Sequence, residues 1–292
     1  MQCKFCKTKP VIKLTNSSIQ LCKVCFTRYF EKKTLKTIRQ YNIIEKNDHL
    51  GIACSGGKDS TSILYIINKY FSKRPDLKIT AIAIDEGIKV YRDVSLNDLK
   101  KFFKTNKINL KIFSFKDEFK KSLDQLVKVY NKPCSVCGVL RRYLLNKCAR
   151  ELKVTKLITG HNMDDESQSI IMNQFRNNIA LSARLGPITG VVSDKRFIRR
   201  AKPFYFLTEK EVKAYSFIKN IVTNFNECPY SIDSYRGEVR DLLNNFEAKH
   251  EGTKHGIINS FIEIMPILKK HYSTSNLKEI KSCKLCAEPC SQ

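Results

Sequence analysis

The sequence predicts an α/β fold: a parallel sheet covered by helices, with an N-terminal zinc ribbon and a C-terminal cysteine knuckle. Two observations support it: from about residue 49 short apolar runs alternate with helical patterns, and Cys-x-x-Cys pairs occur near both ends. The 292 residues exceed the roughly 100–200 of one typical domain, so small modules beside a core are expected. A composition of 42% hydrophobic and 28% charged residues excludes a disordered or fibrous protein.

A zinc ribbon is predicted over residues 1–28. Cys3 and Cys6 form one pair, and Cys22 and Cys25 form the next. This spacing lets four thiolates surround one zinc ion tetrahedrally, and so small a module needs the metal to fold. The alternative is a set of four structural thiols without a metal.

A linking segment, 29–48, follows the ribbon. Residues 27–41 have the pattern of a basic amphipathic helix. Its Lys and Arg side chains either contact phosphate or form a solvated helix face.

The main domain is predicted over residues 49–231. Its predicted strands are residues 49–54, 78–85, 110–115 and 156–160, and its predicted helices are residues 59–71, 94–105, 138–151 and 164–175. Apolar strands that alternate with helices indicate a parallel sheet covered on both faces. Ligands bind beyond the carboxyl ends of such strands, so the residues after each strand are candidate site residues.

The C-terminal third is predicted to be helical. Thr208 and Glu211 form a predicted capping box at the start of one helix. Residues 232–272 continue the helical pattern, with an interruption at Gly252. The tail, 273–292, looks like half of another zinc knuckle because it contains Cys283, Cys286 and Cys290.

A glycine-rich loop, Ser-Gly-Gly-Lys-Asp-Ser at residues 55–60, follows a predicted strand and opens a predicted helix. Two glycines let the backbone approach a polyanion, and successive N–H groups at a helix N-terminus supply partial positive charge. Lys58, expected as a solvent-facing loop residue, and Ser60 add donors. The pattern therefore predicts a phosphate site; the alternative is a turn without a ligand.

Acidic residues follow two other predicted strands, Asp85 and Glu86 after one and Asp164, Asp165 and Glu166 after the other. Adjacent carboxylates at strand ends suit a hydrated Mg²⁺ on a pyrophosphate. A role of Asp164 as the N-cap of the next helix is the alternative, and both roles can hold.

The remaining cysteines divide into two groups. Cys54 and Cys148 stand alone in apolar surroundings and are predicted to be inert packing residues. Cys134, Cys137 and Cys228 leave three interpretations open. They hold a [4Fe-4S] cluster with one open iron, they carry sulfur as a persulfide, or they are purely structural.

The charge balance points to a polyanionic partner. The formal net charge is +25 and the pI is about 9.6. Nucleic acid is favoured over an anionic bilayer because amphipathic membrane-binding features do not stand out. A proteome rich in Lys is the alternative explanation. No run approaches the ~18 apolar residues of a membrane span, so we expect a cytoplasmic protein without membrane contact.

Several motifs occur in order along nearly the whole chain. They are a Cys₄ ribbon, SGGKDS at 55–60, IDEGI at 84–88, PCSVCG at 133–138, GHNMDDE at 160–166, RAKPF at 200–204 and ECPYS at 227–231. Together they resemble the TtcA/TtuA family of PP-loop tRNA 2-thiolation enzymes. The resemblance is to the TtuA branch, which includes the archaeal and eukaryotic wobble-uridine thiolases.

The resemblance implies a Rossmann-like PP-loop ATP pyrophosphatase fold, with residues 49–231 as the catalytic domain. It implies a tRNA uridine 2-sulfurtransferase that uses ATP and Mg²⁺ to adenylate the C2 oxygen, releases pyrophosphate and then AMP, and inserts sulfur. Cys134, Cys137 and Cys228 would hold the [4Fe-4S] cluster or carry sulfur. The implied ATP site comprises Ala53, Ser55, Gly56, Gly57, Lys58, Asp59, Ser60, Arg141, Gly160 and Asp165. The catalytic residues among these sets are Lys58, Asp59, Cys134, Cys228 and Asp165.

The sequence departs from the family at its tail, where only three cysteines remain for a second zinc site. Alternative functions are a 2-thiocytidine tRNA synthetase, a PP-loop synthetase of the amidotransferase type and a non-enzymatic zinc-ribbon RNA-binding protein. The thiolated position, 34 or 54, stays open. The sulfur donor also stays open: it is sulfide, or a ubiquitin-like or persulfide carrier protein. Whether the chain forms a homodimer stays open as well.

Overall fold

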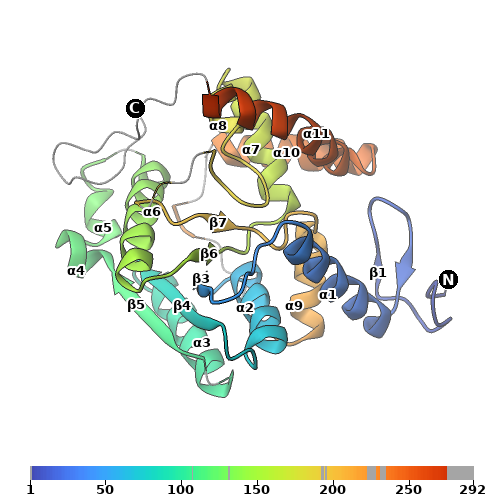
Figure 1. The fold of residues 1–292 in the computed structure, drawn as a ribbon, viewed down its shortest axis with the longest axis horizontal. Helices are drawn as coiled ribbons and strands as arrows, with labels where there is room; N and C mark the ends of the chain where they lie inside the picture. Colours follow the sequence, from blue (N-terminus) through green and yellow to red (C-terminus); the bar gives the residue numbers. More distant parts are fainter. Residues whose placement is uncertain are drawn as a thin grey trace.

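A computed structural model describes the chain except residues 1, 107, 131, 192, 193, 195, 222–227, 231–234 and 275–292. A five-stranded sheet forms its centre (Figure 1). The strand order is β5-β4-β3-β6-β7, and every neighbouring pair is parallel. The strands are β3 His49–Ala53, β4 Lys78–Asp85, β5 Leu110–Ser114, β6 Lys156–Ile158 and β7 Arg200–Ala201. The predicted parallel α/β fold is therefore confirmed.

The strand order reverses between β3 and β6. Successive strands after β3 run outward to one edge of the sheet, whereas β6 and β7 lie on the other side of β3. The loops after β3 and β6 therefore both lie beyond the carboxyl ends of neighbouring strands, the place where open parallel sheets bind ligands. The two-residue strand β7 was not predicted, because so short a strand has no periodic pattern.

Helices cover both faces of the sheet. The helices are α1 Lys23–Gln40, α2 Lys58–Phe71, α3 Tyr91–Asn106, α4 Phe115–Phe119, α5 Leu123–Leu126, α6 Pro133–Glu151, α7 Met163–Phe175, α8 Ile179–Ser182, α9 Glu209–Ile218, α10 Tyr235–Lys249 and α11 Thr253–Thr274. One apolar cluster joins α1, α2, α3 and α9 to one face, and a second joins α4, α5 and α6 to the other. A third cluster packs α7 against α11. Among the described residues, no helix is both long and apolar enough to span a membrane.

The short hairpin β1 (Ile12–Lys13) and β2 (Gln20–Leu21) projects from one side of the molecule (Figure 1). The next helix, α1, begins at Lys23, four residues before the predicted start, because Cys22 caps it through its thiol. Phe30 on this helix is fully buried and stacks on Tyr215 with ring centroids 4.3 Å apart. One helix thus belongs to both the cysteine hairpin and the main core.

Helix α6 begins at Pro133, five residues earlier than predicted. Proline is favoured at the first helical position because the N–H that it lacks has no partner there. Cys134 and Cys137 therefore lie in the first turns of a helix and not in a loop. The capping box of Thr208 and Glu211 at the start of α9 is confirmed.

Candidate functional site

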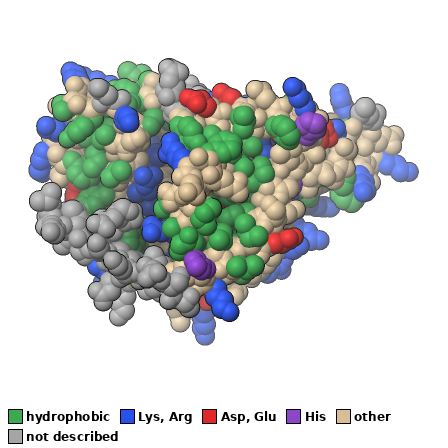
Figure 2. Space-filling model, turned by 90° about the horizontal axis from the view of Figure 1, so that it is seen from above, with side chains coloured by type: hydrophobic (Ala, Val, Ile, Leu, Met, Phe, Trp, Pro, Cys, Tyr) green, Lys and Arg blue, Asp and Glu red, His purple; other side chains and the backbone are tan. Residues whose placement is uncertain are grey.

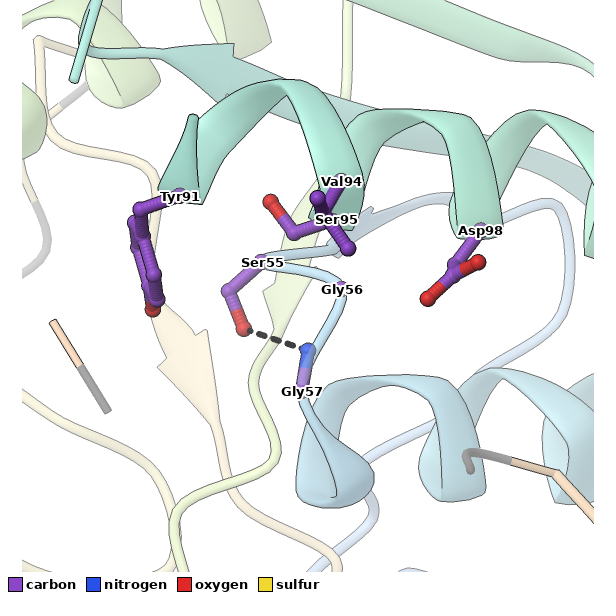
Figure 3. Close-up of a pocket in the computed structure, with 7 residues that line it drawn as sticks. All are labelled: Ser55, Gly56, Gly57, Tyr91, Val94, Ser95 and Asp98. Carbon is purple, nitrogen blue, oxygen red and sulfur yellow. Dashed lines mark hydrogen bonds between the residues drawn. The ribbon is translucent and has the colours of Figure 1, made fainter. Parts of the chain in front are cut away.

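The loop Ser55–Gly57 joins β3 to α2, and short-range hydrogen bonds hold its conformation. Ser60 Oγ accepts the Ser55 N–H at 3.1 Å, and Ser55 Oγ accepts the Gly57 N–H at 3.3 Å (Figure 3). Gly56 has φ of +91°, and a Cβ there would lie 2.9 Å from the Ser95 carbonyl oxygen. Glycine is required at this position on both grounds. The loop therefore has a fixed conformation. Because Gly56 and Gly57 have no side chains, it presents unobstructed backbone at the carboxyl edge of the sheet.

A small hollow adjoins this loop. It is lined by Ser55, Gly56 and Gly57 and, on α3, by Tyr91, Val94, Ser95 and Asp98 (Figure 3). Its volume of about 40 Å³ has room for a few water molecules. A nucleotide is far larger, so most of any bound ATP would lie outside this hollow.

Lys58 is not the solvent-facing loop residue that was predicted. It is the first residue of α2, and its side chain is only 15% exposed. Its ammonium lies 2.9 Å from Asp59 Oδ2 and 2.8 Å from Glu209 Oε1. Burial opposes the charge, but the two carboxylates outweigh it and raise the pKa of Lys58. Glu209 lies 151 positions away on α9, so no local pattern identified it as the partner.

The loop after β6 packs directly on the phosphate loop. A Cβ on Gly160 would lie 2.6 Å from the Asp59 carbonyl carbon, so only glycine fits there. The Asn162 amide donates to Asp59 Oδ1 at 3.1 Å, and its oxygen accepts the N–H groups of Asp164 and Asp165. The N-cap of α7 is thus Asn162, and the predicted capping role of Asp164 is wrong. This contact brings together two segments that are 103 residues apart.

Asp164 and Asp165 have different surroundings. Asp164 is paired with the Lys254 ammonium and accepts the Glu209 N–H at 2.7 Å. Asp165 completes the capping box of α7, since its Oδ2 accepts the Asn162 N–H at 3.1 Å. Burial, and then the charge of nearby Asp59, raises the pKa of Asp165 to about 7. Among the described residues Asp165 has no ion-pair partner, so it can still serve a ligand.

Arg92 was not recognised from the sequence. It is 3% exposed, and its guanidinium donates to the carbonyl oxygens of Ser55 and Ile84. Its Nε lies 3.0 Å from Glu86, which also faces Arg141 at 3.7 Å. Glu86, predicted as a magnesium ligand, is therefore engaged by arginines. The only sequence signal for Arg92 was its place shortly after the IDEGI motif.

The three middle cysteines come from two distant parts of the chain. The Cys134 thiol donates to the Tyr230 carbonyl oxygen at 2.9 Å, so the segment around Cys228 lies against the start of α6. Cys137 and Cys228 pack against the same apolar cluster. Burial raises the pKa of the Cys137 thiol to about 11, against the opposing effect of Arg141. Burial likewise raises the pKa of Cys228.

These three thiols fit a cluster better than a single ion. In the described part of the chain, the only group of three or more possible ligand atoms within 4.8 Å of one another is that of Cys3, Cys6, Cys22 and Cys25. Ligands of one ion must share a coordination sphere, whereas thiolates on different irons of a cube are held further apart. All three donors are thiols, which are the usual ligands of iron–sulfur clusters.

The four N-terminal cysteines form a compact group, as the spacing predicted. Cys6 Sγ lies 3.3 Å from Cys22 Sγ and 3.6 Å from Cys25 Sγ. An all-thiolate set of this size suits tetrahedral zinc. The tail cysteines Cys283, Cys286 and Cys290 lie outside the described residues. Cys54 and Cys148 are buried, as predicted, and burial raises the pKa of each thiol to about 12.

The four-cysteine group gives a first prediction. The full-length Cys6→Ser/Cys25→Ser double variant should contain about one zinc ion fewer per chain than the wild type, because two thiolates cannot complete the site. Elemental analysis of the purified proteins measures this, with Cys54→Ala as the control for loss of a thiol elsewhere. The full chain is needed because α1 packs into the main core. Equal zinc contents in variant and wild type would refute the site.

Comparisons with known proteins agree with this geometry. The profile of the PP-loop domain family matches residues 27–245. A probable sulfurtransferase of Methanocaldococcus jannaschii is 37% identical over 94% of this chain and 80% of its own length. The tRNA-5-methyluridine(54) 2-sulfurtransferase of Pyrococcus horikoshii is 33% identical over 100% of this chain and 90% of its own. The chain belongs to the PP-loop tRNA 2-thiolation family.

A solved structure of this PP-loop family has the same architecture. The U34-tRNA thiolase NcsA from Methanococcus maripaludis, determined with its [4Fe-4S] cluster, superposes with a TM-score of 0.83. It is 30% identical and covers 100% of this chain and 92% of that one. The family resemblance inferred from the motifs is thereby confirmed.

Proposed function

We propose that the chain is an ATP-dependent tRNA uridine 2-sulfurtransferase that adenylates the C2 oxygen of a uridine at position 34 or 54 and replaces it with sulfur. The observation that carries the proposal is that Tyr91 lines the hollow beside the phosphate loop and also packs in the apolar cluster of Cys137 and Cys228. The phosphate loop with Lys58 and Asp59 lies after β3, and the segment of Cys228 lies against Cys134. Membership of the tRNA 2-thiolation family supports the same assignment.

The chain's own groups fit the activation step. Backbone N–H groups at the start of α2 and the loop Ser55–Gly57 would bind the phosphates of ATP. Lys58, held at the first turn of α2, would neutralise the charge that develops on pyrophosphate. Asp165 would contribute to a hydrated Mg²⁺, because Glu86 and Asp164 are already paired with Arg92 and Lys254. Adenylation is needed because oxide is a very poor leaving group, whereas AMP is a good one.

Cys134, Cys137 and Cys228 would supply the thiolate ligands of a [4Fe-4S] cluster. When bound, such a cluster with three protein ligands supplies one iron on which inorganic sulfide can be held. The same three thiols are the residues that a persulfide route would use. Their place beside Arg141 and Glu86, at the edge that carries the phosphate loop, supports delivery of sulfur to an activated base.

Incubation of the anaerobic full-length protein with ATP, Mg²⁺, sulfide and unmodified tRNA tests the proposal. Nucleoside mass spectrometry should find a 2-thiouridine, and the nucleotide products should be AMP and pyrophosphate. Formation of 2-thiocytidine, or of ADP and phosphate, would contradict the proposed reaction. Absence of any ATP turnover would favour a non-enzymatic RNA-binding protein.

Binding to tRNA should depend strongly on salt, because the net charge of +25 acts on phosphates. For about six or more phosphate contacts, the affinity should fall by at least about 10³ between 50 and 200 mM salt. Filter binding with the target tRNA and with a tRNA of unrelated sequence measures this slope. An affinity that hardly changes over this range would show that the positive charge has another purpose.

A further inference from the structure

Four arginines from three elements lie between the middle cysteines and the start of α7. Arg141 and Arg142 are on α6, Arg200 is on β7 and Arg236 is on α10. Arg200 is paired in register with Leu157, whose side chain packs in the apolar cluster of α6. Since register partners of parallel strands point to the same face, Arg200 points toward α6.

The arginines are close enough to repel one another. Partial burial, followed by the charges of Arg142 and Arg141, lowers the pKa of Arg200 to about 10. Burial, followed by the charges of Arg141 and Arg236, lowers the pKa of Arg142. Arg200 is half-buried, and cations held this close to one another are unfavourable unless an anion joins them.

The described part of the chain supplies little negative charge here. Neither Arg142 nor Arg200 has an ion-pair partner among the described residues. Arg236 is held by neutral oxygens, with its guanidinium 3.2 Å from Gln168 Oε1 and 3.0 Å from Ser169 Oγ. Arg141 faces the Glu86 carboxylate at 3.7 Å, and Arg236 lies near enough to Asp165 for its charge to oppose the rise in the pKa of that carboxyl. The cluster therefore has charge available for an external anion.

Arg141, Arg142 and Arg236 are exposed at the surface. Figure 2 shows Lys and Arg side chains in a hollow between the side of the molecule that carries α6 and the middle, over which α7, α10 and α11 lie. Arg236 contacts the start of α7, since its guanidinium is 3.5 Å from the Asp165 carbonyl oxygen. Arg142 lies on the same helix as Cys137, five positions further along. An anion bound here would lie between the cysteines and Asp165.

We propose that Arg142 and Arg200, together with Arg236, bind a backbone phosphate of the tRNA beside the target uridine and so position the base for thiolation. This inference rests on the proposed function. A guanidinium offers two parallel N–H donors that match two phosphate oxygens, whereas hydrosulfide has a single acceptor atom and fits this fork less well. A base taken out of its stack needs its backbone held, and phosphate contacts provide that positioning. The phosphates of ATP are assigned to another place, the start of α2.

The test compares Arg200→Gln and Arg142→Gln with Arg74→Gln, which removes the same charge near the opposite end of the sheet, where Arg74 pairs with Asp76. The first two variants should bind tRNA about tenfold more weakly, and the salt slope of binding should fall by about one. Arg200→Lys should recover part of the affinity. The Kd for ATP, the KM for sulfide and the iron content should stay at wild-type values.

Three results would overturn the proposal. One is an increase in the Kd for ATP without a change in tRNA binding, which would assign the arginines to the nucleotide. Another is an increase in the KM for sulfide alone. The third is an equal loss of tRNA affinity in Arg74→Gln and Arg200→Gln, which would show a diffuse charge effect. Because direct tRNA binding is measured, a wild type that makes no 2-thiouridine would refute the proposed function and leave this test intact.

Discussion

The Lys58→Ala variant is expected to lose at least about 10²–10³ in the rate of AMP formation, the usual cost of removing one preorganised group that stabilises a developing charge. Lys58 is held by Asp59 and Glu209 at the first turn of α2, so its side chain is already ordered next to the phosphate loop. The measurement is release of AMP and pyrophosphate with saturating tRNA and sulfide.

Two comparisons make the Lys58 result interpretable. Lys73→Ala removes an exposed lysine just beyond the same helix and should keep wild-type activity. Thermal melting should show that Lys58→Ala is folded, because only one ion-paired side chain is lost. Glu209→Gln keeps the lysine and loses only its partner, so we expect a smaller loss of rate. A Lys58→Ala enzyme as active as Lys73→Ala would remove Lys58 from the mechanism.

The second large effect concerns Cys228. The anaerobic wild type should contain about four irons per chain beyond the N-terminal metal, and Cys228→Ala should lose them together with all thiolation. Release of AMP and pyrophosphate should persist at a reduced rate, because the phosphate loop lies on different elements. Iron analysis, visible absorbance and nucleoside mass spectrometry on one preparation measure these effects.

Cysteine variants alone do not separate a cluster from a persulfide, since both use the same thiols. The decisive sample is iron-free wild-type protein. Thiolation of tRNA from a persulfide donor by that sample would overturn the cluster, whereas restoration of activity only after reconstitution with iron and sulfide would support it. Cys148→Ala is the control, because Cys148 is buried in the core and contributes only to packing.

Local signals in the sequence predicted most of the fold. The apolar runs gave β3, β4 and β5 almost to the residue, and the capping box gave the start of α9. The phosphate loop was identified because its glycines and its position between a strand and a helix are local features. The compact group of four cysteines was likewise predicted from spacing alone.

Apart from some helix starts, the N-cap of α7 and the short strand β7, the errors concern contacts between distant segments. Nothing near Lys58 indicates that Glu209 will hold it, and nothing near Asp164 indicates a pair with Lys254. Arg92 lies in an ordinary helical pattern, yet its guanidinium ties together the ends of β3 and β4. Charged side chains carry no periodic signal of their own, so their partners emerge only when the chain is folded.

The loop after β6 supports the phosphate loop from 103 residues away, and the partner of Lys58 lies 151 residues away. During synthesis the phosphate loop is therefore complete in sequence long before it is complete in structure. A nascent chain that ends before α9 contains Ser55–Ser60 but lacks Glu209, one of the two carboxylates that fix Lys58. Pairings across such long separations form slowly, because a long loop must close before any contact stabilises it. The phosphate loop would thus reach its final shape only after α9 has been made and packed.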